Sequence, residues 1–325
     1  MQGPLFEQGQ NPISDFIPVS RIADMLLNPG GPYNFNGEKR IYPDIKLVYW
    51  CGGNPFHHHQ DLNRLNKAWQ YPETVIVHEP WWTATAQRAD IVFPATTQFE
   101  RSDIGWAKGD PYLFYMPQMI SPVGLAKDDY DIFADLSKKL HCKQTFTENL
   151  SSEEWIKRIY DIFYMQSKEL GIKVSTFEEL KEKNFERLAI DKDEDDFVPF
   201  KAFRDDPSKN PLGTPSGKIE IYSERIAKFN YPEIPGHPIF NKPQVDKKFP
   251  LRLLSPQPYD KLHSQLQSAI EDLNKYAVLV MNPQDAEERG ISEGDLIKTW
   301  NSRGSCLATL KIKKTIIPGV ISWRR

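Results

Sequence analysis

Three short apolar runs, each followed by polar residues, constrain the fold of this chain more than any other feature. The runs are IKLVYW (45–50), TVIVH (74–78) and DIVFPA (90–95). A helical segment is expected at 61–69, with Asp61 as its N-cap, and TATAQRA (83–89) indicates a short helix between the last two runs. Buried strands that alternate with helices are typical of a parallel α/β sheet. We therefore expect the first part of the chain to form an α/β domain.

The remaining sequence predicts more helices, a linker and a small β domain. Helices are expected at 129–140, at 153–169 with a capping box of Ser151 and Glu154, and after Ser175 and Glu178; strands are expected at 112–116 and 217–223. Residues 1–228 would form the α/β domain, and the proline-rich segment 229–249 would be a linker. Residues 250–325 carry short strands, turns and one short helix capped by Asn282, which is typical of a small β-barrel, here truncated.

Composition excludes several classes of function. The 325 residues carry a formal net charge of -3, which does not favour a nucleic-acid partner. No apolar run approaches the roughly 20 residues that a membrane-spanning helix needs, so we expect no membrane insertion. Cys51, Cys142 and Cys306 lie far apart and form no CxxC motif, which argues against a metal or iron–sulfur site built from cysteines.

The segment CGGNPFHHHQ (51–60) follows the first expected strand and precedes a helix. Ligands of open α/β sheets bind beyond the carboxyl ends of strands, and glycine lets the backbone approach a phosphate. A ligand-binding loop is therefore the favoured interpretation. Two alternatives stay open: an ordinary surface loop, and a metal site at His57 and His59, because three consecutive side chains point in different directions.

Polar residues also follow the other two strands. His78 and Glu79 end the second strand, and Thr96, Thr97, Arg101 and Asp103 follow the third. Arg101 could hold a phosphate through its guanidinium or form a salt bridge with a neighbouring acid. Likewise, Asp129 and Asp131 could complement a helix dipole or accept hydrogen bonds from the N–H edge of a guanine.

Long sequence blocks resemble a known family. VYWCGGNPFHHHQDLNRL, VHEPWWTATAQRADIVFPATTQFERSDIG and DDYDIFADLSKKL, in that order, resemble the molybdopterin oxidoreductases of the dimethyl-sulfoxide reductase family, and most closely its trimethylamine-N-oxide and biotin-sulfoxide reductase branch. LRLLSPQPYDKLHSQL and VLVMNPQDAEERGISEGDLIKTWNSRGS resemble the dinucleotide-binding barrel of that family.

The resemblance implies a bis(molybdopterin guanine dinucleotide) molybdenum cofactor and an S-oxide or N-oxide substrate. It also implies an electron donor, either a c-type cytochrome or a thiol or reductase system. Matched residue by residue, the dinucleotide contacts fall on Gly52, Asn54 and His58, on His78, Arg101 and one of Asp129 and Asp131, and on Ser255, His263, Ser264 and Gln265 of the barrel.

Two departures from the family pattern shape the expected activity. Nothing in this sequence matches the segment that carries the molybdenum-ligating serine, and the barrel lacks its last strands. We therefore expect a C-terminal fragment with no catalytic or metal-ligating residue of its own, inactive alone, with a separate chain as a possible source of the N-terminal half. The alternative is a module that binds the cofactor without catalysis.

Overall fold

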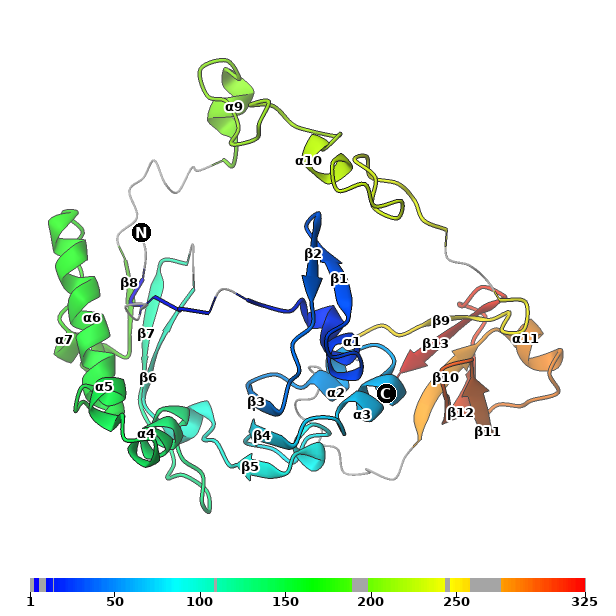
Figure 1. The fold of residues 1–325 in the computed structure, drawn as a ribbon, viewed down its shortest axis with the longest axis horizontal. Helices are drawn as coiled ribbons and strands as arrows, with labels where there is room; N and C mark the ends of the chain where they lie inside the picture. Colours follow the sequence, from blue (N-terminus) through cyan, green and yellow to red (C-terminus); the bar gives the residue numbers. More distant parts are fainter. Residues whose placement is uncertain are drawn as a thin grey trace.

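The computed structural model describes residues 3–5, 10–13, 15–107, 110–188, 198–242, 246–257 and 276–324. In this part of the chain the strands form four separate sheets. Figure 1 shows a parallel sheet in the middle, a sheet with long helices on one side of it, and the C-terminal sheet on the other. The chain segment that connects these two outer sheets is extended and contains the short helices α9 (Lys201–Asp205) and α10 (Glu224–Ala227).

The parallel sheet has the strand order β3 (Leu47–Cys51), β4 (Thr74–His78), β5 (Ile91–Phe93). This confirms the three strands expected from the apolar runs. Cys51 pairs with His78, and His78 pairs with Phe93, so the three strands end level with one another. The polar segments that follow the strands therefore start from one edge of the sheet.

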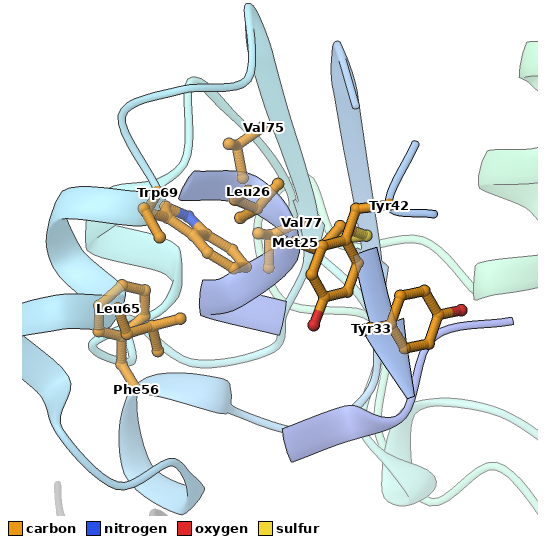
Figure 2. Close-up of a cluster of buried hydrophobic side chains, with 10 residues drawn as sticks. Met25, Leu26, Tyr33, Tyr42, Phe56, Leu65, Trp69, Val75 and Val77 are labelled. Carbon is orange, nitrogen blue, oxygen red and sulfur yellow. The ribbon is translucent and has the colours of Figure 1, made fainter. Parts of the chain in front are cut away.

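Short helices pack against this sheet and close its core. They are α1 (Ile22–Leu27), α2 (Pro55–His58) and α3 (Leu62–Ala68), and Asp61 caps α3 by accepting a hydrogen bond from the Arg64 N–H, as expected. Figure 2 shows the cluster of side chains that these elements bury, among them Met25, Leu26, Tyr33, Tyr42, Phe56, Leu65, Trp69, Val75 and Val77. Tyr33 belongs to the hairpin β1 (Pro32–Phe35) and β2 (Glu38–Ile41), which the sequence did not predict.

A second, antiparallel sheet holds β6 (Asp103–Trp106), β7 (Tyr112–Met116) and β8 (Phe185–Arg187). The helices α6 (Ser152–Glu169) and α7 (Phe177–Lys183) cover it through a core of Leu113, Tyr115, Tyr160, Phe163, Phe177, Leu180 and Leu188. Helices α4 (Asp129–Lys139) and α5 (Lys143–Thr147) contact each other beside this unit. The helices expected at 129–140 and 153–169 are confirmed.

The C-terminal sheet has the order β11-β12-β10-β13-β9. Its strands are β9 (Arg252–Leu254), β10 (Ala277–Met281), β11 (Leu296–Trp300), β12 (Ser305–Ile312) and β13 (Val320–Arg324), and α11 (Pro283–Glu287) starts at Asn282 as expected. Leu279, Leu310 and Ile321 form the centre of its core. The expected fold class, a parallel α/β sheet followed by a small β domain, is confirmed.

Two local predictions need correction. Residues 217–223 form bends and turns rather than a strand, and Ile219 and Ile221 are each 74% exposed. The alternation of apolar residues in this segment is compatible with a strand. A strand, however, also needs a neighbouring strand with which to form backbone hydrogen bonds. TATAQRA is helical only at η2 (Ala86–Arg88), a single 3₁₀ turn. The boundaries at 228, 249 and 250 stay predictions.

In the described ranges, no helix combines the length and apolar character that crossing a membrane requires.

Candidate functional site

The turn after β3 contains two consecutive glycines at the edge where the parallel strands end. Gly52 and Gly53 have φ values of 75° and 76°, in the left-handed region that favours glycine. Within the described residues, neither of their N–H groups donates a hydrogen bond. A Cβ atom on Gly52 would meet nothing within 4 Å. Successive free N–H groups in such a turn can bind a phosphate oxygen.

Asn54 fixes this turn to the sheet. Its side chain is 4% exposed, and its Oδ1 accepts a short hydrogen bond from the Thr85 hydroxyl. The Asn54 carbonyl oxygen accepts from the N–H groups of His57 and His58, which starts α2 with Pro55 at its first position. Because the side chain is buried, a ligand could contact Asn54 only through its backbone.

The histidine triplet lies at the C-terminal end of α2. His57 and His58 are exposed, with ring centroids 5.4 Å apart and planes at 86°. His59 is partly buried, which lowers its pKa, and His58 lowers it further. Among the residues that the structure describes, no group of three His, Cys, Asp or Glu side chains is placed to hold a metal ion. The metal interpretation therefore gains no support, and the contact expected from His58 stays a prediction.

His78 lies at the end of β4 with its side chain 1% exposed. Its Nδ1 is 2.7 Å from Asp129 Oδ1, and its Nε2 is 2.9 Å from the Tyr49 hydroxyl. The rings of Tyr49, Phe93 and Phe133 surround it at centroid distances of 5.3, 5.6 and 5.0 Å. Both ring nitrogens are thus engaged inside the protein, so a ligand cannot reach the ring in this arrangement.

Arg101 and Asp131 meet in a different place, a polar cleft beyond β5. The cleft has a volume of about 360 Å³, and its lining also includes Glu100, Ser102, Gln118, Lys127, Asp128, Ser152 and Glu153. Arg101 donates to the Thr96 carbonyl at 3.0 Å and lies 3.4 Å from Asp103, so the salt-bridge alternative is present in this structure. Burial raises the pKa of Asp131, and the neighbouring Asp128 and Asp135 raise it further.

The two candidate carboxylates of DDYD, Asp129 and Asp131, therefore lie in different surroundings. Asp129 and Asp131 are two positions apart in the first turn of α4. Side chains at i and i+2 on a helix point to different sides. Asp129 consequently turns toward His78, whereas Asp131 lines the polar cleft that Arg101 also lines. From the sequence, Asp129 and Asp131 were alternatives for the same contact, whereas in the structure their side chains lie in different places.

On the barrel side only one expected contact can be placed. Ser255 directly follows the edge strand β9 and is exposed. His263, Ser264 and Gln265 lie outside the described residues. The C-terminal domain nevertheless contacts the α/β domain, because Asn63 Nδ2 of α3 donates to the Arg303 carbonyl at 2.7 Å.

The sequence did not reveal the hydrogen bonds that hold the candidate site residues in place. Thr85 holds Asn54, Tyr49 holds His78, and the Thr96 hydroxyl donates to Asp128 at 2.7 Å. No sequence motif identifies Tyr49 or Thr85. Tyr49 stands in the apolar run IKLVYW, and Thr85 stands in the segment TATAQRA, which predicts a short helix. Only their three-dimensional neighbours identify them.

Comparison with known proteins decides the family. Residues 31–139 match the model of the molybdopterin oxidoreductase family, and residues 251–324 match that of the molybdopterin dinucleotide binding domain. The chain is 42% identical over 98% of its length to biotin sulfoxide reductase of Cereibacter sphaeroides. It is 43% identical over 94% of its length to dimethyl sulfoxide/trimethylamine N-oxide reductase of the same organism, and 42% identical over 94% to trimethylamine-N-oxide reductase of Haemophilus influenzae.

This chain belongs to the molybdopterin oxidoreductase family.

The match to these oxidoreductases covers a part of each relative. The chain spans 44% of the length of the biotin sulfoxide reductase and 38% of the other two reductases. Among solved structures, acetylene hydratase from Pelobacter acetylenicus superposes on 87% of this chain and 37% of its own, with a TM-score of 0.64 at 21% identity, which supports the fold. The family and the dinucleotide domain also confirm the expected cofactor, bis(molybdopterin guanine dinucleotide) molybdenum.

Proposed function

We propose that this chain is the cofactor-binding part of a molybdenum-dependent reductase of S-oxides or N-oxides. Biotin sulfoxide, dimethyl sulfoxide and trimethylamine N-oxide are the candidate substrates, because relatives that are 42–43% identical are named for them. When bound, the cofactor supplies the redox chemistry and the oxygen-atom transfer, while the protein binds and orients it. Electrons would come from a cytochrome or a thiol-based donor.

The observation that carries the proposal is the glycine turn. It lies at the edge of the parallel sheet where β3, β4 and β5 all end. Two consecutive N–H donors with no acceptor among the described residues and open space above Gly52 fit the pyrophosphate of a dinucleotide. Asp129 is hydrogen-bonded to His78, and His78 pairs with Cys51, the residue directly before the glycine turn. The carboxylate therefore stands beside the turn, where it could accept from a guanine or pterin N–H.

Calorimetric titration of the purified chain with GMP and GDP tests this proposal. We expect both to bind, and GDP more tightly, because the turn would hold its second phosphate. AMP should bind more weakly, because adenine lacks the adjacent N1–H and N2–H donors of guanine, which one carboxylate can accept from together. Absence of binding by GMP and GDP at millimolar concentration would contradict the proposal.

Gly52→Ala and Gly53→Ala should each weaken GDP binding about tenfold, since a left-handed backbone costs an L-residue about 1–2 kcal/mol. Gly30→Ala is the matched control. Gly30 has a φ of 76° and open space around its Cβ position, but it lies in another turn. This variant should lose stability without losing affinity, and an equal loss of affinity in all three variants would refute a phosphate-binding role for the turn.

A cofactor-binding module without catalysis is the second candidate. An assay with reduced viologen and each of the three oxides tests whether the cofactor-loaded chain reduces an oxide by itself. We expect the isolated chain to bind nucleotide without turnover, since the reductases it matches are much longer. Robust turnover by the cofactor-loaded chain alone would assign the whole reductase activity to it.

A further inference from the structure

The tip of the β1–β2 hairpin is a two-residue turn made of Asn36 and Gly37. Phe35 pairs with Glu38 across the ladder, so these two residues alone connect the strands. Both have positive φ values, 49° for Asn36 and 85° for Gly37. A two-residue hairpin turn with both φ values positive is a type I′ turn, for which Asn-Gly is a preferred sequence. The sequence holds no second Asn-Gly pair.

An asparagine followed by glycine can react with its own backbone, because glycine has no side chain to obstruct the approach. The Gly37 nitrogen attacks Cγ of the Asn36 side chain, a new N–Cγ bond forms, and the side-chain amide leaves as ammonia with the proton of the Gly37 N–H. Water then opens the resulting succinimide ring at either carbonyl, which leaves aspartate or isoaspartate at position 36. Nothing is oxidised or reduced, and water is the one co-reactant.

The electrophile of this reaction is accessible, whereas the nucleophile is held. Asn36 is exposed, and among the described residues none forms a hydrogen bond with its side-chain amide. The Gly37 N–H, in contrast, donates to the hydroxyl oxygen of Tyr231 at 2.9 Å, across 194 residues of sequence. A backbone nitrogen must lose its proton before it attacks, and a hydrogen bond to an acceptor retains that proton.

A second aromatic residue covers the same nitrogen. A Cβ atom placed on Gly37 would lie 2.6 Å from Phe229 Cδ1, so the Phe229 ring lies directly against the Gly37 backbone. The rings of Phe229 and Tyr231 are 5.8 Å apart, and both residues are partly buried. Figure 1 shows the hairpin extending toward the segment after α10, to which these two residues belong. Together they limit the access of hydroxide to the Gly37 N–H.

We infer that Asn36 is a deamidation site and that the Tyr231 hydroxyl protects it by holding the Gly37 N–H. The modification adds a carboxylate two positions before Glu38. Its isoaspartyl form also lengthens the backbone of the two-residue turn by one carbon, which a type I′ turn does not accommodate. The hairpin would then lose its contact with Tyr231. The inference is independent of the proposed function.

Incubation of the purified full chain in mildly alkaline buffer tests the inference, with aspartate and isoaspartate at position 36 followed by peptide mass spectrometry. Tyr231→Phe should react about fivefold faster than the wild type, the factor that loss of one typical hydrogen bond gives. Amide hydrogen exchange at Gly37 should accelerate in the same variant. Tyr222→Phe is the matched control, since Tyr222 packs on His237 in the same segment. It should behave like the wild type in both measurements.

The pair Asn301–Ser302 in the C-terminal domain is an internal reference, and its deamidation rate should be the same in all three proteins. Equal rates at Asn36 in the wild type and Tyr231→Phe would overturn the inference. So would an equal acceleration at Asn301, because it would indicate general loosening of the variant.

The wild type alone provides a second test that does not depend on the folding of a variant. Asn36 should deamidate at least about tenfold more slowly in the folded chain than in urea, because the protecting contact exists only in the folded state. Equal rates in the two conditions, or no deamidation of Asn36 in urea, would refute the protected site. Thermal unfolding of Tyr231→Phe shows which of the two comparisons applies.

Discussion

Glu100 shows how much a single side chain contributes to the shape of the polar cleft. Its carboxylate, on a residue only 5% exposed, accepts from the Thr97 N–H and hydroxyl and from the Val123 N–H, each at 2.7 Å. These bonds lower the pKa of Glu100, and the Thr97 backbone N–H is the largest cause. The residue therefore ties the loop around Val123 to the segment after β5.

Glu100→Gln should destabilise the protein by about 1.5–3 kcal/mol at pH 7, because hydrogen bonds to a buried charge are lost or weakened. The pKa of Glu100 is lower in the folded than in the unfolded chain, so its contribution is present above the unfolded pKa and disappears as pH falls through the folded pKa. Urea denaturation across pH should show the difference between wild type and variant shrinking on acidification.

The exposed Glu153, which lines the same cleft, provides the control. Glu153→Gln should change stability by no more than about 0.5 kcal/mol. A loss for Glu100→Gln that persists unchanged below its folded pKa would contradict the electrostatic explanation.

At the scale of elements, helix caps were the most predictable features. The cap of α7 shows where prediction from neighbouring residues alone fails. Ser175 with Glu178 and Thr176 with Glu179 both fit the capping-box spacing. In the structure Thr176 caps α7, because the Ser175 N–H and hydroxyl both donate to Glu186 of β8. A contact with a strand eleven residues away therefore shifted the cap by one position.

Ser151→Ala should destabilise α6 by about 1 kcal/mol, since it removes the N-cap hydroxyl. That hydroxyl accepts from the Glu154 N–H at 3.3 Å and donates to the Glu154 carboxylate at 2.7 Å. Circular dichroism during thermal unfolding would measure the loss. Ser152→Ala, one residue further into the helix, is the matched control and should have a smaller effect; equal effects would argue against the cap.

At the scale of the whole molecule, the C-terminal sheet meets the α/β sheet through the turn at Arg303. Asn301 Oδ1 accepts from the Arg303 and Gly304 N–H groups and shapes this turn, and Asn63 Nδ2 holds the Arg303 carbonyl. A Cβ atom on Gly304 would lie 2.7 Å from Asn63 Nδ2, so glycine permits the close approach. The contact places the dinucleotide domain beside the loop that follows β3.

Asn63→Ala should release this contact and speed amide hydrogen exchange in residues 301–304, because a local hydrogen bond worth about 1 kcal/mol is removed. Exchange in the core strands β4 and β10 should not change. Asn66→Ala serves as the control, since Asn66 bonds to Arg88 within the α/β domain. Exchange in the turn that is equally slow in Asn63→Ala and wild type would show that other contacts hold it.

The sequence by itself determined the three strands of the parallel sheet, the longer helices and the edge at which ligands are expected. Apolar periodicity and caps are properties of consecutive residues, so IKLVYW, TVIVH and Asp61 were sufficient to locate β3, β4 and the start of α3. The strand expected at 217–223 failed because strand formation also needs a partner that no local pattern supplies.

Only the tertiary structure decided what each polar side chain does. Gly52 was assigned to the turn from its residue type alone, but Asp129 and Asp131 stayed alternatives until packing placed them, and the burial of His78 was not predicted. The helix geometry of α4 sends its two carboxylates to different sides, and the pairing of β3 with β4 closes the histidine between Tyr49 and Phe133. Such assignments depend on distances between residues far apart in the chain, which composition and spacing do not contain.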